Sequence, residues 1–336
     1  MRDFNDFHDC TVAVTGASAG IGRAVALRFA KAGARLGLIA RDAEALRAVQ
    51  AEIEKLGGSA VVAPADVADA EAVFAAAEQI RQAFGPTDIW INDAMVTVFS
   101  PVWEMTPEEF RRVTEVTYLG FVHGTLAALR DMRPRGRGTI IQIGSALAYR
   151  GIPLQAAYCG AKHAIRGFTN SLRTELIHAG SEINVSMVEL PAVNTPQFDW
   201  ARTHMGQQPR PVPPVVQPEV IAEAVFRVAQ KPQRELWIGW STLKAILGNM
   251  LIPGLLDRYL AHNTVAAQQS RAPVSPMRQD NLMEPIHHLH RTRGRFDREA
   301  SASAVAIAGP VARLAPVAAG ALALIGVALL ASRRRG

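Results

Sequence analysis

The chain has 336 residues, of which 49% are hydrophobic, so it can bury a large core in one or two domains. The formal charge is +6 and the pI about 9.7, but much of the basic excess lies in arginines after residue 290, which argues against nucleic acid as a partner of the core. With only two cysteines and a polar stretch instead of a signal peptide over residues 2–9, we expect a cytoplasmic protein.

Strands and helices are predicted to alternate along most of the chain. A first strand over 11–14 leads through a glycine-rich turn into a helix over 21–32, and a buried strand follows at 36–40. The alternation continues with helices over 42–56, 69–84, 107–132, 155–179 and 218–231, and with strands over 60–64, 88–92, 139–143, 183–190 and 235–239. This order favours an α/β fold with a doubly wound parallel sheet (Rossmann fold), as a single domain over 8–240 with a C-terminal extension.

The turn after the first strand has the form of a phosphate site. In residues 15–22 (TGASAGIG), Gly16 permits a tight turn, Gly20 lets the backbone approach a pyrophosphate, and Gly22 lets helix and strand pack closely. The following helix N-terminus adds N–H donors and a favourable dipole. A turn without a ligand is the weaker interpretation, because the motif lies in the first βαβ unit.

Tyr158 and Lys162 are four positions apart on the helix predicted over 155–179, so they share one face. Lowering a phenol pKa from about 10 to about 7 takes roughly 4 kcal/mol, which one ammonium about 4 Å away supplies at an effective dielectric near 20. Tyr158 is therefore a candidate general acid or base. A tyrosine and a lysine at this spacing are more often unrelated surface residues. The catalytic interpretation therefore depends on the other motifs of the chain.

Together the motifs resemble the short-chain dehydrogenase/reductase family, whose members are single-domain Rossmann oxidoreductases. The resemblance covers about residues 8–240 and rests on residues 15–22, Asp66 with Val67, Asn92-Asp93-Ala94, Ser145, and Tyr158 with Lys162. A bacterial subgroup with a long C-terminal extension shares some of this chain's departures from the family pattern.

The resemblance implies catalytic roles for three residues and suggests a fourth residue as a candidate for the proton relay. Ser145 would hold the substrate carbonyl oxygen, Tyr158 would donate or remove the proton, and Lys162 would lower the phenol pKa and bond the nicotinamide ribose. Thr117 stands where the family has an asparagine that holds a water in the proton relay, and Met95 replaces a glycine beside the cofactor. Thr117 keeps a hydroxyl of shorter reach, so it stays a candidate for the relay.

The resemblance also implies cofactor-binding residues. Asp66 and Val67 would contact the adenine. Asn92 would lie near the adenine-side ribose, and Thr195 would bond the carboxamide of the nicotinamide. Helix capping is the alternative for Asp66 and Thr195, and a strand end is the alternative for Asn92. The glycine-rich turn would add its own contacts, from Gly16, Ser18, Gly20, Ile21 and Gly22.

The end of the second strand selects between the two nicotinamide cofactors. A carboxylate there binds the ribose 2′-OH of NAD, whereas an arginine accommodates the 2′-phosphate of NADP. Ala40 stands at the acidic position and Arg41 follows it, while Asp42 lies one step too far and is a candidate helix cap. We therefore predict NADP(H) with Arg41 as a binding residue, and no metal.

The composition of three segments near and after the end of the predicted sheet indicates what each of them forms. Residues 196–218 form a long, irregular proline-rich stretch of the kind that is either a functional lid or disordered. Residues 241–262 are an expected apolar helical extension, which favours a lipophilic ketone, aldehyde or alcohol as substrate, with core or dimer contact as the alternative. Residues 263–312 are rich in Gln, Arg, Ser and Pro and are predicted to be a flexible linker with solvated histidines.

Residues 313–336 are predicted to be a transmembrane tail with a basic terminus. The 18 residues 314–331 carry no charge, and as a helix they span about 27 Å, close to a hydrocarbon core of about 30 Å. The expected arrangement is a cytoplasmic catalytic domain anchored to the membrane by its C-terminus. Arginines flank both ends and leave orientation open, and a soluble Ala-rich tail is the alternative.

The leading functional hypothesis is an NADPH-dependent oxidoreductase that reduces a carbonyl to an alcohol, or runs the reverse reaction. The alternative from another class is a catalytically impaired dinucleotide-binding sensor or scaffold, suggested by Thr117 and Met95. The resemblance also implies a homodimer or homotetramer, paired through the helix before Ser145 and the helix that carries Tyr158.

Overall fold

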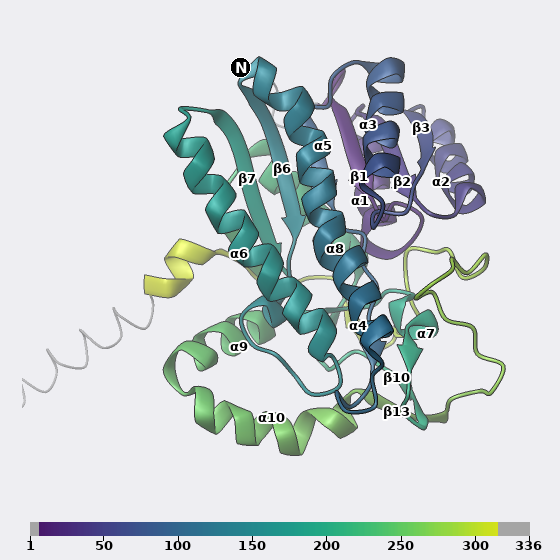
Figure 1. The fold of residues 1–336 in the computed structure, drawn as a ribbon, viewed down its shortest axis with the longest axis vertical. Helices are drawn as coiled ribbons and strands as arrows, with labels where there is room; N and C mark the ends of the chain where they lie inside the picture. Colours follow the sequence, from purple (N-terminus) through teal and green to yellow (C-terminus); the bar gives the residue numbers. More distant parts are fainter. Residues whose placement is uncertain (1–6, 315–336) are drawn as a thin grey trace, which may run out of the picture.

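The computed structural model describes residues 7–314, which form an α/β structure of three layers (Figure 1). Within these residues, an eight-stranded sheet forms the middle layer in the order β15-β12-β7-β6-β4-β1-β2-β3. All its neighbouring strands are parallel except β12 and β15. The predicted doubly wound sheet is confirmed, and the antiparallel edge strand is an addition that the sequence did not indicate.

The parallel strands are short, and the inner ones are almost wholly buried because helices cover both faces. They are β1 (Thr11–Thr15), β2 (Arg35–Ala40), β3 (Ser59–Pro64), β4 (Ile89–Asn92), β6 (Arg137–Ile143), β7 (Glu182–Glu189) and β12 (Glu235–Ile238).

Each face of the sheet has its own hydrophobic cluster. One cluster joins the sheet to α1 (Gly20–Ala30), α2 (Ala43–Lys55) and α8 (Pro218–Gln230). The other joins it to α3 (Ala70–Phe84), α4 (Pro107–Thr114), α5 (Gly120–Arg135) and α6 (Ala156–His178). The single helix predicted over 107–132 is instead α4 and α5, joined by a π-helical stretch, Glu115–Leu119.

The lid-like stretch predicted over 196–218 contains only short elements. They are α7 (Gln197–Trp200), β9 (Arg202–Thr203), β10 (Gln207–Pro209) and β11 (Val215–Val216), and β9 pairs with β5 (Val98–Phe99). The apolar extension that follows is helical, as α9 (Trp240–Leu251) and α10 (Pro253–Ala267). The two helices meet at Ile252, because the proline that follows starts a new helix and cannot continue the old one.

The flexible linker predicted over 263–312 is not what the structure shows. β13 (Gln269–Pro273) pairs with β10, β14 (Ala300–Ser301) joins β11 and β8 (Ala192–Val193) in a small sheet, and β15 (Ala306–Ala308) extends the main sheet. Three apolar side chains of the segment, Leu282, Ile286 and Phe296, are buried. Its order comes from contacts with distant residues, which composition does not report.

The transmembrane tail predicted over 313–336 lies, apart from its first two residues, outside the described part of the chain. Arg313 is described and pairs with the buried carboxylate of Glu235. Among residues 7–314, no helix combines the length and apolar character needed to cross a membrane.

Candidate active site

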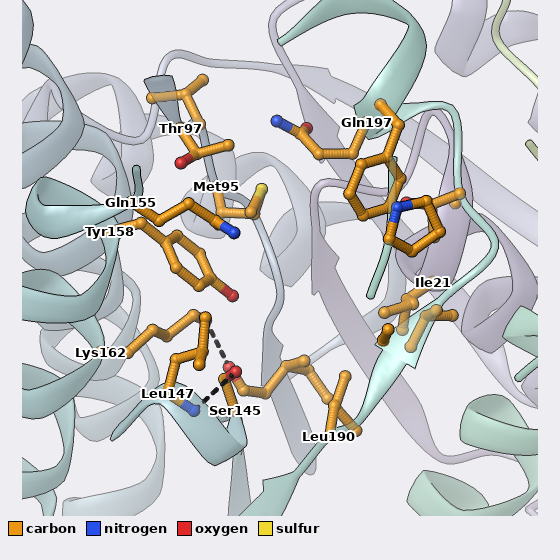
Figure 2. A pocket seen from close by; sticks show the side chains of 18 of the residues that line it. Ile21, Met95, Thr97, Ser145, Leu147, Gln155, Tyr158, Lys162, Leu190 and Gln197 are labelled. Atoms are coloured by element: carbon orange, nitrogen blue, oxygen red, sulfur yellow. Dashed lines mark hydrogen bonds between the residues drawn. The ribbon is translucent and has the colours of Figure 1, made fainter. Parts of the chain in front are cut away.

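A cavity of about 810 Å³ lies where the carboxyl ends of the parallel strands meet. Its wall combines the glycine-rich turn after β1, residues at the ends of β2, β4, β6 and β7, and side chains of α9 and α10. Figure 2 shows Tyr158, Lys162 and Ser145 on one side of this cavity, with Ile21 of the turn on the other. The structure thus brings together the two motifs on which the sequence analysis rests.

The glycine-rich turn has the geometry that its glycines were expected to serve. Gly16 and Gly20 have φ angles of +73° and +57°, in the left-handed region that favours glycine. A Cβ on Gly22 would lie 2.3 Å from the carbonyl oxygen of Gly16, so only glycine fits between helix and strand. α1 begins at Gly20, and Ser18 and Ile21 line the cavity. The turn therefore fits a pyrophosphate at a helix N-terminus.

Ser145 and Lys162 are held by hydrogen bonds to groups at and just beyond the ends of β6 and β7. The backbone N–H of Ser145 donates to Oε2 of Glu189 at 2.7 Å, and Ser145 Oγ accepts from the backbone N–H of Leu147 at 3.1 Å. The Lys162 ammonium donates to the carbonyl oxygen of Ile143 at 2.7 Å and lies 5.6 Å from the centre of the Tyr158 ring. These bonds fix Ser145 and Lys162, and Tyr158 lies beside both of them at the cavity.

The electrostatics of this group are dominated by burial. Burial raises the pKa of the Tyr158 phenol above its ordinary value, although a hydrogen bond with Ser145 opposes that shift. Burial likewise lowers the pKa of the Lys162 ammonium, against the attraction of Asp93 and Glu189. Burial thus opposes the lowering of the phenol pKa that was predicted from Lys162. A phenol that keeps its proton is suited to donate it to a carbonyl oxygen.

Two carboxylates beside this group, Glu189 and Asp93, were given no role in the sequence-based prediction. Burial raises the pKa of Glu189 to about 8, and the charge of Glu235 adds to the effect. Burial also raises the pKa of Asp93, whose Oδ2 lies behind the turn, 2.9 Å from where a Cβ on Gly22 would stand. One signal was available for each: Asp93 replaces the family's asparagine, and Glu189 is a charge at the end of an apolar strand.

Thr117 lies in the π-helical stretch and is fully buried. Its hydroxyl donates to the carbonyl oxygen of Val96 at 2.8 Å and accepts from the N–H of the same residue at 3.1 Å. The side chain therefore ties the helix to the loop after β4. Its role in a proton relay stays a prediction.

Asn92 does not reach the cofactor side, so the predicted ribose contact is wrong. Its side chain is fully buried, donating to Gln142 Oε1 at 2.9 Å and to Thr125 Oγ1 at 3.2 Å, and accepting from Trp90 Nε1 at 2.8 Å. Successive side chains of a strand point to opposite faces, so Asn92 faces α5 while Asp93 lines the cavity. The alternative of a strand-end residue is correct.

Asp66, Val67 and Thr195 all line the cavity, as their predicted roles require. Asp66 is not a helix cap, because the side chain that caps α3 is Asp69. Its carboxylate pairs instead with Arg112 of α4. Thr195 lies against the turn, since a Cβ on Gly20 would be 3.3 Å from its methyl carbon. Their contacts to a cofactor stay predictions.

Arg41 and Asp42 follow β2, and the predicted helix cap is confirmed for Asp42, while cofactor binding by Arg41 stays a prediction. Asp42 caps α2 by accepting from the N–H groups of Glu44 and Ala45 at 2.9 and 3.0 Å. Arg41 lines the cavity, and its guanidinium donates to the carbonyl oxygens of Asn281 and Met283. The arginine is therefore at the place where a 2′-phosphate is expected, but it also holds a part of the chain that the sequence analysis left outside the site.

The remaining wall of the cavity is mainly apolar. Its contributors include Met95 after β4, Phe198 of α7, Trp240 of α9, and Leu256 and Tyr259 of α10. The apolar extension predicted after the last parallel strand thus borders the same space as the Ser–Tyr–Lys group.

The fold and the site together define a dinucleotide-binding oxidoreductase. The family model described as short chain dehydrogenase matches residues 10–205, and the chain therefore belongs to the short-chain dehydrogenase/reductase family. It is 31% identical over 284 residues to the uncharacterized oxidoreductase YxnA of Bacillus subtilis, covering 84% of this chain and 80% of the relative. It is also 31% identical over 224 residues to a fatty acyl-CoA reductase of Acinetobacter baylyi, covering 66% of this chain and 73% of that protein.

Solved structures agree with this assignment. An alcohol dehydrogenase from the archaeon Thermococcus sibiricus, complexed with 5-hydroxy-NADP, matches with a TM-score of 0.58 and 26% identity. A metagenomic short-chain oxidoreductase in complex with NADP matches with a TM-score of 0.58 and 30% identity. Each match covers 68% of this chain and 95% of the solved one.

Proposed function

We propose that this protein is an NADP(H)-dependent oxidoreductase that interconverts a carbonyl compound and an alcohol. The observation that carries the proposal is the convergence of Ser145, Tyr158 and Lys162 on the cavity that also contains the glycine-rich turn. A proton donor beside a dinucleotide site is the pairing that carbonyl reduction needs, because one hydride and one proton are added.

The residues present fit NADP(H) as the cofactor. The turn offers backbone N–H groups at a helix N-terminus for the pyrophosphate, and Arg41 offers a cation at the end of β2 for the 2′-phosphate. Two structural relatives were solved with NADP or a derivative of it, which supports the same choice. When bound, the cofactor supplies or accepts the hydride.

The chain's own residues would handle the proton and the substrate oxygen. In reduction, the Tyr158 phenol donates its proton to the oxygen that becomes the alcohol, while the Ser145 hydroxyl holds that oxygen in place. In oxidation, the same phenol oxygen receives the proton. Lys162, held by Ile143, places a positive charge near the phenol and favours its ionised form during the transfer.

We further propose a lipophilic substrate. The apolar wall from α7, α9 and α10 supports it, and so does the relative named for a fatty acyl-CoA substrate. In a panel of aldehydes of increasing chain length, kcat/KM is expected to rise with length. A preference for short polar substrates would contradict the lipophilic pocket and leave the cofactor proposal intact.

Replacing Tyr158 tests the catalytic proposal. Tyr158→Phe removes only the hydroxyl, so we expect at least a thousandfold lower kcat with NADPH affinity almost unchanged. Tyr259→Phe is the matched control, because it removes a phenol from the same cavity at a side chain that is 60% exposed, and it should keep its activity. Wild-type protein that binds NADPH yet reduces nothing in a broad carbonyl panel would favour the sensor or scaffold alternative.

Membrane attachment through residues 314–331 also belongs to the proposal. The support is the uncharged sequence of that stretch and the place from which it departs. Ala312 packs with Leu243 and Ile246 of α9. The end of α9 and the start of α10 expose apolar side chains, among them Met250, Leu251, Ile252, Leu255 and Tyr259. An apolar tail would thus start beside α9, the helix that leads into these exposed apolar side chains.

A further inference from the structure

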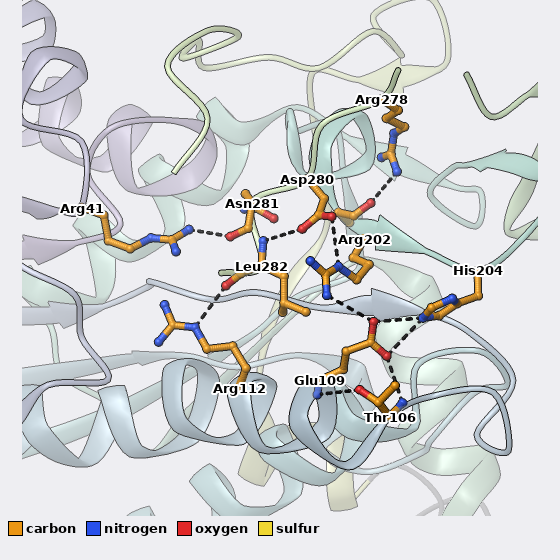
Figure 3. A network of polar contacts seen from close by, with 11 residues as sticks. Arg41, Thr106, Glu109, Arg112, Arg202, His204, Arg278, Asp280, Asn281 and Leu282 are labelled. Atoms are coloured by element: carbon orange, nitrogen blue, oxygen red, sulfur yellow. Dashed lines mark hydrogen bonds and ion pairs between the residues drawn. The ribbon is translucent and has the colours of Figure 1, made fainter. Parts of the chain in front are cut away.

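Residues 280–291, here called the strap, cross the cavity wall between β13 and β14. The strap is bonded to the helix and strand ends that surround the predicted adenosine half of the cofactor site. Arg41, after β2, donates to the carbonyl oxygen of Met283 at 2.8 Å. Figure 3 shows its bond to the carbonyl oxygen of Asn281, and the bond from Arg112 of α4 to that of Leu282 at 3.1 Å. Both guanidinium groups therefore hold the strap through hydrogen bonds to its backbone.

The other end of the strap is bonded to the glycine-rich turn and α1. The N–H of Gly20 donates to the carbonyl oxygen of Arg291 at 3.0 Å, and Arg23 donates to that of His290 at 3.0 Å. His287 contacts the Asp42 carboxylate at 2.8 Å. The strap thus spans from the end of β2 to the start of α1, the two places where an NADP-binding Rossmann fold holds the 2′-phosphate and the pyrophosphate.

One apolar side chain anchors the strap. Leu282 is fully buried and belongs to the same hydrophobic cluster as Ala65, Val67 and Val116, which line the cavity. A buried leucine stabilises a contact more than a single exposed ion pair does, so Leu282 contributes more to holding the strap than any one of its exposed charges.

Other strap side chains form part of the cavity itself. Asn281, Pro285, Ile286 and His290 line it, together with Arg41 and other residues of the predicted adenosine site. Ile286 is only 5% exposed, so its side chain is packed into the cavity wall. Asp280 also accepts from Arg202 Nε at 3.0 Å, which ties the strap to the stretch after α7 (Figure 3).

We propose that the strap is the outer wall of the site for the adenosine half of NADP(H), and that it has to open for the cofactor to enter and leave. The inference rests on the proposed cofactor and adds a part of the chain to its site. The cofactor would lie between the strap and the sheet, with Arg41 held in place by the strap's carbonyl groups. Cofactor exchange is then limited by release of Leu282 from its cluster.

Stopped-flow fluorescence of NADPH, displaced by excess NADP⁺, tests this on the full chain. Leu282→Ala and Ile286→Ala are expected to increase the dissociation rate constant of NADPH at least tenfold. Met277→Ala is the matched control, because Met277 precedes the strap on the same segment and is 88% exposed, so its rate constant should stay within twofold of wild type.

A truncated ligand separates a wall from a general loss of structure. Reduced nicotinamide mononucleotide lacks the adenosine half, so its affinity should be the same in wild type and in both strap variants. Affinity lost equally for both ligands would assign the strap a purely structural role and overturn the proposal. NADPH dissociation that is unchanged in Leu282→Ala and Ile286→Ala would overturn it while leaving the proposed function standing. Wild type that binds no NADPH would overturn both.

Discussion

Glu189 is the residue for which the structure makes the sharpest energetic prediction. Burial raises the pKa of its carboxyl from an ordinary 4.5 to about 8. In the unfolded chain this carboxyl ionises near pH 4.5, whereas in the folded chain it stays protonated up to about pH 8. The contribution of Glu189 to the free energy of unfolding is therefore fully present below pH 4.5 and is lost as the pH rises toward 8. With about 1.4 kcal/mol per pKa unit, Glu189 lowers the free energy of unfolding by about 2.5 kcal/mol between pH 6 and pH 9.

Glu189→Gln should remove this pH dependence, because the amide oxygen still accepts from the Ser145 N–H but carries no charge. Urea unfolding at pH 6 and pH 9 measures it: the stability of the variant relative to wild type should increase by about 2.5 kcal/mol at the higher pH. Glu182→Gln, an exposed position at the start of the same strand, is the control and should follow wild type. Parallel pH profiles of Glu189→Gln and wild type would refute the reasoning.

Two further predictions concern the cofactor and the tail. Arg41→Ala should lower kcat/KM for NADPH about tenfold to a hundredfold with a much smaller effect for NADH, because a charge-assisted hydrogen bond contributes about 1.5–3 kcal/mol; wild type that uses NADH equally well, with no change on substitution, would contradict this. Carbonate-washed membranes should retain the full chain and lose a version truncated before Arg313. Full-length protein found wholly in the soluble fraction would exclude the anchor.

The sequence predicted the parts of the fold that follow local rules. Alternating strands and helices gave the parallel sheet, and the spacing of Tyr158 and Lys162 on α6 placed them together, because helical periodicity is a local property. Asp42 was correctly expected to cap α2, since a cap depends on only three neighbouring residues.

The predictions failed where the structure depends on contacts between residues far apart in the sequence. The strap has no periodic pattern, and its order depends on arginines some 170 to 240 positions earlier in the chain, with Leu282 as its buried anchor. Asn92 and Asp93 are adjacent, and only the orientation of β4 in the sheet decides which of them faces the cavity. For Glu189 the sequence offers one signal, a charge at the end of an apolar strand, but that signal does not report the burial that raises its pKa.

The last described strand, β15, covers one edge of the main sheet and so limits how copies of the protein can associate. β15 pairs with β12 from Leu236 with Ala308 to Ile238 with Ala306, so the outer hydrogen-bonding groups of β12 are used within one chain. Two sheets therefore cannot join edge to edge through β12, and the three residues of β15 offer only a short edge in its place. The pairing leaves two other kinds of surface unaffected, the opposite edge strand β3 and the helix faces of α5 and α6, where Leu126 and Ile177 are exposed.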